Sequence, residues 1–139
     1  MVERDVVLAK MATIDRCLNR IAEVQRPRGG TLTSVDVEDI MVLNLTRAAQ
    51  ATIDLATHVV TTEAYGLPDS VGAAFGLLAK QGVIADSLAD RMRKMVGFRN
   101  IAVHDYQTLD PDVLHSIVEH HLEDLRVFAQ AIIERFNVA

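Results

Sequence analysis

The stretch VEDIMVLNLTRAAQATIDLATHVV, residues 37–60, decides the fold of this chain. Apolar side chains recur in it every three or four residues, which is the period of an α-helix with one buried face. The main row is formed by Val37, Met41, Leu45, Ala48, Thr52, Leu55 and Val59, and a second row is formed by Ile53, Ala56 and Val60. Because the apolar face is so broad, we expect a helix over about residues 35–64 that lies at the centre of a bundle or is shared with a second subunit.

The rest of the chain has the same helical spacing, and alternating β-branched runs are absent. It predicts helices over about residues 2–25, 70–80 and 110–136, and another that starts near Asp86. Ser34 is the expected N-cap of the central helix, Asp110 and Pro111 form a cap and first-position proline, and residues 27–30 make the first linker. We therefore predict an all-α chain, residues 1–139 forming a single domain: an antiparallel helical bundle with four principal helices plus one short helix.

Composition narrows the range of functions. The chain is 50% hydrophobic, so it is expected to fold, yet it has no apolar run long enough to cross a membrane. Its first residues are charged and lack the apolar block of a signal peptide, which indicates a cytoplasmic protein. Cys17 is the only cysteine and is expected to be buried. A net charge of -5 disfavours broad binding to nucleic acid, but residues 90–99 hold four basic side chains and one acid, which favours a local phosphate contact.

The residue types that can take part in catalysis occur together in one short segment, Arg99-Asn100-Ile101-Ala102-Val103-His104-Asp105-Tyr106. Histidine moves protons near neutral pH, and arginine stabilises negative charge on phosphorus, so this pair of residue types can break a phosphodiester without a metal. On a helical wheel Arg99 lies about 20° from Leu88, at the centre of the apolar stripe. An unpaired buried guanidinium is costly, so Arg99 must face a carboxylate, a subunit interface or a cleft. One structural alternative is an ion pair with an acid of the central helix, such as Asp54.

His104 lies about 140° from Arg99 on a regular helix, so the two side chains cannot converge within one straight helix. Either the helix distorts or ends between them, or another chain completes the site. Asn100 shares a face with His104 and could fix its tautomer or touch the same phosphate. We interpret the other histidines as structural: His58 is expected to pair with Asp54, and His115, His120 and His121 lack the spacing of a zinc site.

The motif resembles the signature of HEPN domains, Arg-polar-x3-His, and its longer form Arg-x4-His-x-Tyr resembles that of the HepT-like toxins, which are paired with MntA-like nucleotidyltransferase antitoxins. The resemblance implies a metal-independent endoribonuclease toxin without a cofactor, acting on tRNA or mRNA as a homodimer whose motif helices meet across the two-fold axis. Arg99 and His104 would be the catalytic pair, with Asn100 and Asp105 in support, and the antitoxin would transfer AMP to Tyr106.

Under this interpretation His104 is the general base on a ribose 2′-OH, Arg99 stabilises the pentacovalent phosphate, and the products are a 2′,3′-cyclic phosphate and a 5′-hydroxyl. The alternative is a non-catalytic HEPN binding or dimerisation module that partners a nucleotidyltransferase. In that case the chain would be harmless when expressed alone, whereas a toxin would stop growth.

Overall fold

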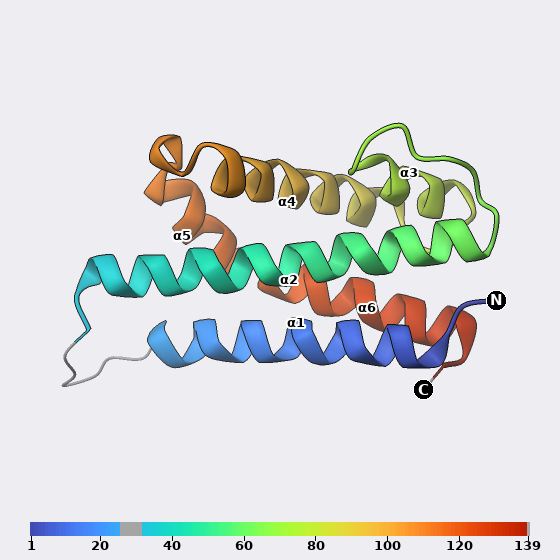
Figure 1. Ribbon diagram of the computed structural model, residues 1–139, viewed down its shortest axis with the longest axis horizontal. Helices are drawn as coiled ribbons and strands as arrows, with labels where there is room; N and C mark the ends of the chain where they lie inside the picture. The colour runs from blue at the N-terminus through green and yellow to red at the C-terminus, as the bar shows by residue number, and fades with distance from the viewer. Residues whose placement is uncertain (26–31, 139) are drawn as a thin grey trace.

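The computed structural model describes residues 1–25 and 32–138, and within these ranges every regular element is a helix (Figure 1). The elements are α1 (Arg4–Gln25), α2 (Ser34–Thr62), α3 (Ala73–Lys80), α4 (Asp86–His104), the short 3-10 helix η1 (Tyr106–Thr108), α5 (Pro111–His120) and α6 (Leu122–Phe136). The predicted all-α fold is confirmed. The predicted linker at residues 27–30 lies outside the described residues.

Helix α2 is the centre of the bundle, as its broad apolar face predicts. It runs antiparallel beside α1, its most extensive contact, and it also contacts α3, α4, α5 and α6 (Figure 1). Leu45, Leu55, Val59 and their neighbours on this face are fully buried. Elsewhere in the core, the rings of Phe75 on α3 and Phe128 on α6 meet edge to face at 5.3 Å between centroids. Burial of this apolar surface is the main stabilising term, and it holds α4 against the bundle.

The helix starts follow local hydrogen bonding. The N-cap of α2 is Thr33 and not the predicted Ser34, because the Thr33 hydroxyl accepts from the Asp36 amide while the Asp36 carboxylate accepts from the Thr33 amide. This reciprocal capping box satisfies two amides that the helix itself leaves free. The start of α5 is as predicted: Asp110 caps it by accepting from the Asp112 amide, and Pro111 stands in the first turn.

The C-terminal helix predicted over residues 110–136 is wrong in one respect, because the chain breaks it at His121 into α5 and α6. His121 has φ -127° and ψ 2°, which turns the backbone out of the α5 axis. Its ring contacts Asp124 at 3.1 Å, from a half-buried position and not from the core. The break re-aims α5 so that it covers the end of the bundle near the C-terminus of α4 (Figure 1).

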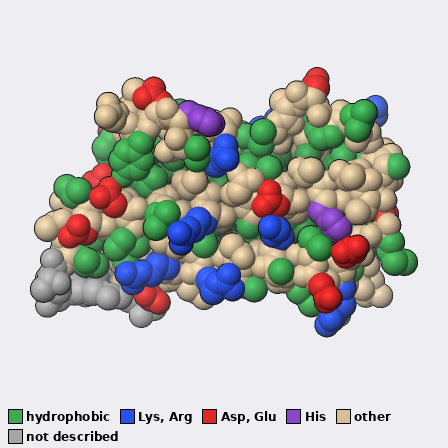
Figure 2. Space-filling model, viewed as in Figure 1, with side chains coloured by type: hydrophobic (Ala, Val, Ile, Leu, Met, Phe, Trp, Pro, Cys, Tyr) green, Lys and Arg blue, Asp and Glu red, His purple; other side chains and the backbone are tan. Residues whose placement is uncertain are grey.

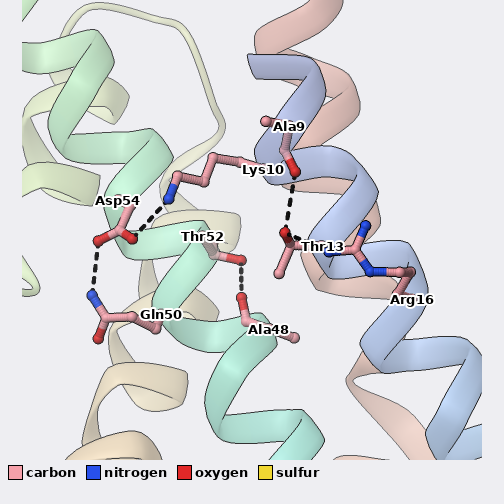
Figure 3. A network of polar contacts seen from close by, with 8 residues as sticks. All are labelled: Ala9, Lys10, Thr13, Arg16, Ala48, Gln50, Thr52 and Asp54. Carbon is pink, nitrogen blue, oxygen red and sulfur yellow. Dashed lines mark hydrogen bonds and ion pairs between the residues drawn. The ribbon is translucent and has the colours of Figure 1, made fainter. Parts of the chain in front are cut away.

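Polar contacts link α1 to the middle of α2 (Figure 3). The Lys10 ammonium donates to Asp54 at 3.1 Å, and the Gln50 amide donates to the other oxygen of the same carboxylate at 2.8 Å. The expected pairing of His58 with Asp54 is therefore wrong. The His58 ring instead accepts a hydrogen bond from the Glu3 amide at 3.1 Å, at the start of α1. No described helix is long and apolar enough to cross a membrane.

Candidate functional site at the end of α4

Helix α4 carries the motif and stays regular through its last residue, His104. The amide of Asp105 still donates to the Ile101 carbonyl at 2.8 Å, so the helical bonding continues past Arg99 and Asn100 without a bulge. The helix ends because Asp105 leaves the helical region at φ -151° and ψ 55°. Of the two ways in which one chain could bring the motif together, distortion or an early end of the helix, neither occurs.

Arg99 lies half-buried on the bundle side of α4, as the wheel predicts. Its Nη1 donates to the Asn100 side-chain oxygen at 3.0 Å. Its Nε atom is buried and has no hydrogen-bond partner among the described residues. The predicted structural alternative, an ion pair with Asp54, does not form, because Asp54 binds Lys10 and Gln50. Within the described chain, Arg99 is thus a partly desolvated cation without a carboxylate, which is a costly state for a residue with a purely structural role.

His104 is exposed and makes no hydrogen bond or ion pair with another described residue. Asn100 does not orient it, since the Asn100 amide oxygen accepts from Arg99. Because α4 is regular, Arg99 and His104 point about 140° apart around its axis. The structure therefore brings Arg99 and Asn100 together and leaves His104 separate within one chain.

Tyr106 opens η1 directly after the motif helix and is 48% exposed. Its hydroxyl donates to the Oδ1 atom of Asp39 on α2 at 2.5 Å, a short distance for a hydrogen bond between a phenol and a carboxylate. Asp105, next to it, is exposed, and its carbonyl accepts from both the amide and the hydroxyl of Thr108 at 3.0 Å. These bonds define the turn and tie it to the first turns of α2.

The pKa of Tyr106 is raised above its ordinary value, chiefly because its proton is held in the hydrogen bond to Asp39. Partial burial and the negative charges of Asp39 and Glu38 act in the same direction. Glu38 in turn lies 4.0 Å from the ring of His115 on α5. The tyrosine proton therefore sits in an acidic environment at the edge of the motif.

Two recesses flank the end of α4. A groove of about 410 Å³ lies between α2 and the turn, lined by Asp39, Val42, Leu43, Thr46, Ala102 and Tyr106. A cleft of about 750 Å³ lies on the other side, between α4 and α5, and its lining includes Lys94, Phe98, Ile101, Leu109, Val113 and Ile117. Both recesses are open to solvent, and Tyr106 lines the first of them, whereas Arg99, Asn100 and His104 line neither.

Basic side chains gather mainly over the middle of α1 and α2, with acidic side chains among them and little basic surface over α4 (Figure 2). Arg16 and Arg47 belong to neighbouring helices and both lower the pKa of the buried Cys17 thiol, whose net shift is upward because burial outweighs them. Positive charge is thus concentrated locally on a chain of net charge -5. No group of three or more metal-ligating side chains occurs in the part of the chain that the structure describes.

Residues 14–132 match the protein family described as "Ribonuclease HepT-like", a span that includes all of α4 and its motif. The chain belongs to the HepT-like ribonuclease family. It is 41% identical over 128 residues to the "mRNA nuclease HepT" of Shewanella oneidensis, a match covering 92% of this chain and 96% of the relative. A "tRNA nuclease HepT" of Aphanizomenon flos-aquae is 23% identical over 132 residues, covering 94% of this chain and 90% of the relative.

The fold of this HepT-like chain also matches a solved structure, the tri-AMPylated HEPN toxin of Shewanella oneidensis in complex with its MNT antitoxin. The TM-score is 0.84 at 41% sequence identity, and the match covers 92% of this chain and 96% of the other. The similarity to the HepT-like family expected from the motif is confirmed.

Asp39 is the residue of this region that the sequence did not single out. Its hydroxyl partner lies 67 residues away along the chain, so no local spacing connects the two. Only the packing of α2 against the end of α4 brings them together.

Proposed function

We propose that this HepT-like chain is the toxin of a two-component system: a metal-independent endoribonuclease whose active site forms between two copies of the chain. The observation that carries the proposal is the state of the motif on α4. Among the described residues Arg99 is partly desolvated without a carboxylate partner, His104 makes no hydrogen bond or ion pair, and the regular helix keeps the two apart. A second α4, placed across a two-fold axis, supplies the His104 that one chain cannot bring to Arg99.

In this site His104 acts as general base on a ribose 2′-OH, and the partner's His104 or water protonates the leaving 5′ oxygen. Arg99 stabilises the charge that develops on the pentacovalent phosphate, and Asn100 holds the guanidinium in place through their 3.0 Å hydrogen bond. The products are a 2′,3′-cyclic phosphate and a 5′-hydroxyl. Asp105 supports the site by ending the helix directly after His104.

RNA is the substrate that the surroundings of the motif favour. The basic side chains over the middle of α1 and α2 can contact the phosphate backbone of an RNA that reaches the motif on α4 (Figure 2). The relatives are named as an mRNA nuclease and a tRNA nuclease, which supports RNA as the substrate class.

The same proposal includes the partner. An MntA-like nucleotidyltransferase antitoxin transfers AMP to Tyr106, whose hydroxyl is at the surface beside the motif. The added phosphate places a negative charge near His104 and repels RNA. The AMPylated toxin bound to its MNT antitoxin in Shewanella oneidensis supports this assignment.

Expression of the chain alone in a host without an antitoxin tests the toxin function. Wild type is expected to stop growth, and Arg99→Ala and His104→Ala are expected to relieve the arrest. The matched control is Arg93→Ala, which removes an exposed arginine of the same helix that pairs with Asp90. Growth arrest that survives both motif substitutions would refute the nuclease assignment.

The purified protein tests the chemistry. RNA cleavage is expected to be unchanged in EDTA and to leave 5′-hydroxyl ends that a kinase can label. Light scattering at micromolar concentration is expected to give a dimer. A strictly monomeric protein with full activity would exclude the shared site. A chain that is harmless alone yet binds the nucleotidyltransferase would instead be the binding module.

A further inference from the structure

The hydrogen bond between Tyr106 and Asp39 joins the proposed acceptor of AMP to a carboxylate on α2. The phenol oxygen and the Oδ1 atom of the carboxylate are 2.5 Å apart, and the phenol donates this hydrogen bond. Asp39 is exposed near the start of α2, and among the described residues its carboxylate makes no other hydrogen bond or ion pair. A carboxylate in this position is already the hydrogen-bond acceptor for the proton that the tyrosine loses when it becomes a nucleophile.

We infer that Asp39 is the proton acceptor for AMP transfer to Tyr106, so that the modified chain itself supplies the general base for its own modification. The inference rests on the proposed function, because it requires Tyr106 to be the acceptor. The partner supplies the nucleoside triphosphate and the divalent cation. The chain supplies both the nucleophile and the base.

The Tyr106 oxygen attacks the α-phosphorus of ATP, forming an O–P bond, while the bond from that phosphorus to the bridging oxygen breaks and pyrophosphate leaves. The phenol proton moves to the Asp39 carboxylate as the O–P bond forms and then passes to solvent. Phosphoryl transfer to hydroxyl groups commonly uses an aspartate in this position, which orients the nucleophile and accepts its proton.

The raised pKa of Tyr106 is consistent with this role. In the resting protein the Asp39 hydrogen bond and the nearby Glu38 charge keep the phenol protonated, so free phenolate is rare. A carboxylate that accepts the proton during the attack therefore spares the reaction the need for a free phenolate. The charge of Glu38 on α2 acts on the phenol, and His115 on α5 lies 4.0 Å from Glu38; neither is hydrogen-bonded to the tyrosine oxygen.

The experiment follows the first AMP adduct by intact mass after purified chain is mixed with ATP, Mg²⁺ and the MNT antitoxin of Shewanella oneidensis. The toxin of that organism serves as the positive control for the transferase. Compared with wild type, Asp39→Asn is expected to slow the first addition about 100-fold, the usual effect of losing a general base. Asp39→Glu keeps a carboxylate and is expected to restore part of the rate, and Tyr106→Phe is expected to take no adduct.

Glu38→Gln is the matched control. It removes a neighbouring negative charge that acts on Tyr106 without touching its oxygen, and it is expected to leave the rate within a few-fold of wild type. A pH series separates a base from a structural contact. The Asp39→Asn rate is expected to rise steeply toward the ordinary phenol pKa of about 10, where phenolate forms without help, while the wild-type rate changes less.

The outcomes are distinguishable. If Asp39→Asn, shown to be folded by its helical circular dichroism and melting, is modified at the wild-type rate, the inference is overturned. If wild type takes no adduct, or takes it elsewhere than Tyr106, the inference fails together with the assignment of the acceptor. If the adduct forms at Tyr106 and depends on Asp39 while the unmodified chain cleaves no RNA, the inference stands and the nuclease proposal fails.

Discussion

Replacing Arg99 by methionine separates a functional arginine from a structural one. A buried donor without a partner costs about 1–3 kcal/mol, and the Nε atom of Arg99 is in this state. Methionine removes that cost and fills the same apolar position near Met95 with an unbranched chain. It also removes the bond from Nη1 to Asn100, a contact between adjacent residues at a partly exposed site, for which we allow about 1 kcal/mol.

The net change in the free energy of unfolding is therefore expected between zero and a gain of about 2 kcal/mol. Breaking a buried ion pair, by contrast, costs about 3–5 kcal/mol. For a chain of this size 1 kcal/mol corresponds to a shift in melting temperature of roughly 3 °C, so the two expectations are well resolved. Cleavage of RNA is expected to be lost in the same variant.

Urea unfolding followed by circular dichroism measures the change, repeated at several protein concentrations so that any dimer contribution is separated. The matched control is Arg126→Met. Arg126 on α6 binds Asp15 and Asn19 of α1, each at 3.1 Å, so its loss is expected to destabilise the protein by about 1 kcal/mol. A loss of 3 kcal/mol or more in Arg99→Met would refute the reasoning, because it would mean that Arg99 has a carboxylate partner in solution.

Coexpression of Arg99→Ala and His104→Ala chains, each inactive alone, is expected to restore growth arrest, because the mixed dimer keeps one site with both side chains; persistent growth with a verified mixed dimer would exclude the shared site. The Cys17 thiol is expected to react with a disulfide reagent far more slowly in the native than in the denatured protein, since burial raises its pKa; equal rates would contradict its burial. The pKa of Asp36 is lowered chiefly by its hydrogen bond with the Thr33 backbone. Its stabilising effect is therefore present above the ordinary carboxyl pKa of about 3.9 and is lost as pH falls through the lowered pKa. Wild type is expected to be more stable than Asp36→Asn at neutral pH and to lose this advantage in acid, which unfolding at both pH values measures.

The parts of the fold that depend on local spacing could be predicted from the sequence. The apolar face of α2 predicts its central position, and the Asp110-Pro111 pair predicts the start of α5. The break at His121 could not be predicted, because apolar side chains continue at helical spacing across it, from Val118 to Leu125, and neither glycine nor proline marks it. Here the packing of α5 against the end of the bundle overrides a continuous helical pattern.

In the candidate site, too, the features set by local helical spacing could be predicted, and the contacts between distant segments could not. The position of Arg99 on the bundle side of α4 follows from the wheel, because a regular helix fixes the direction of each side chain. The partners of His58 and Tyr106 depend on contacts between helices that are distant in sequence. The i,i+4 rule pairs His58 with Asp54, but the Glu3 amide, just before α1, binds His58 and the Lys10 ammonium of α1 binds Asp54, and these contacts replace the local one.

The regularity of α4 through His104 has a consequence for gene dosage. If cleavage needs two chains, a newly made copy is harmless until it meets another, and the activity from scarce copies falls with the square of their number. Occasional leaky transcription is then tolerated without any antitoxin, whereas a burst of synthesis raises the chain concentration above the level at which dimers form. A helix that bent enough to unite its own arginine and histidine would remove this safety margin.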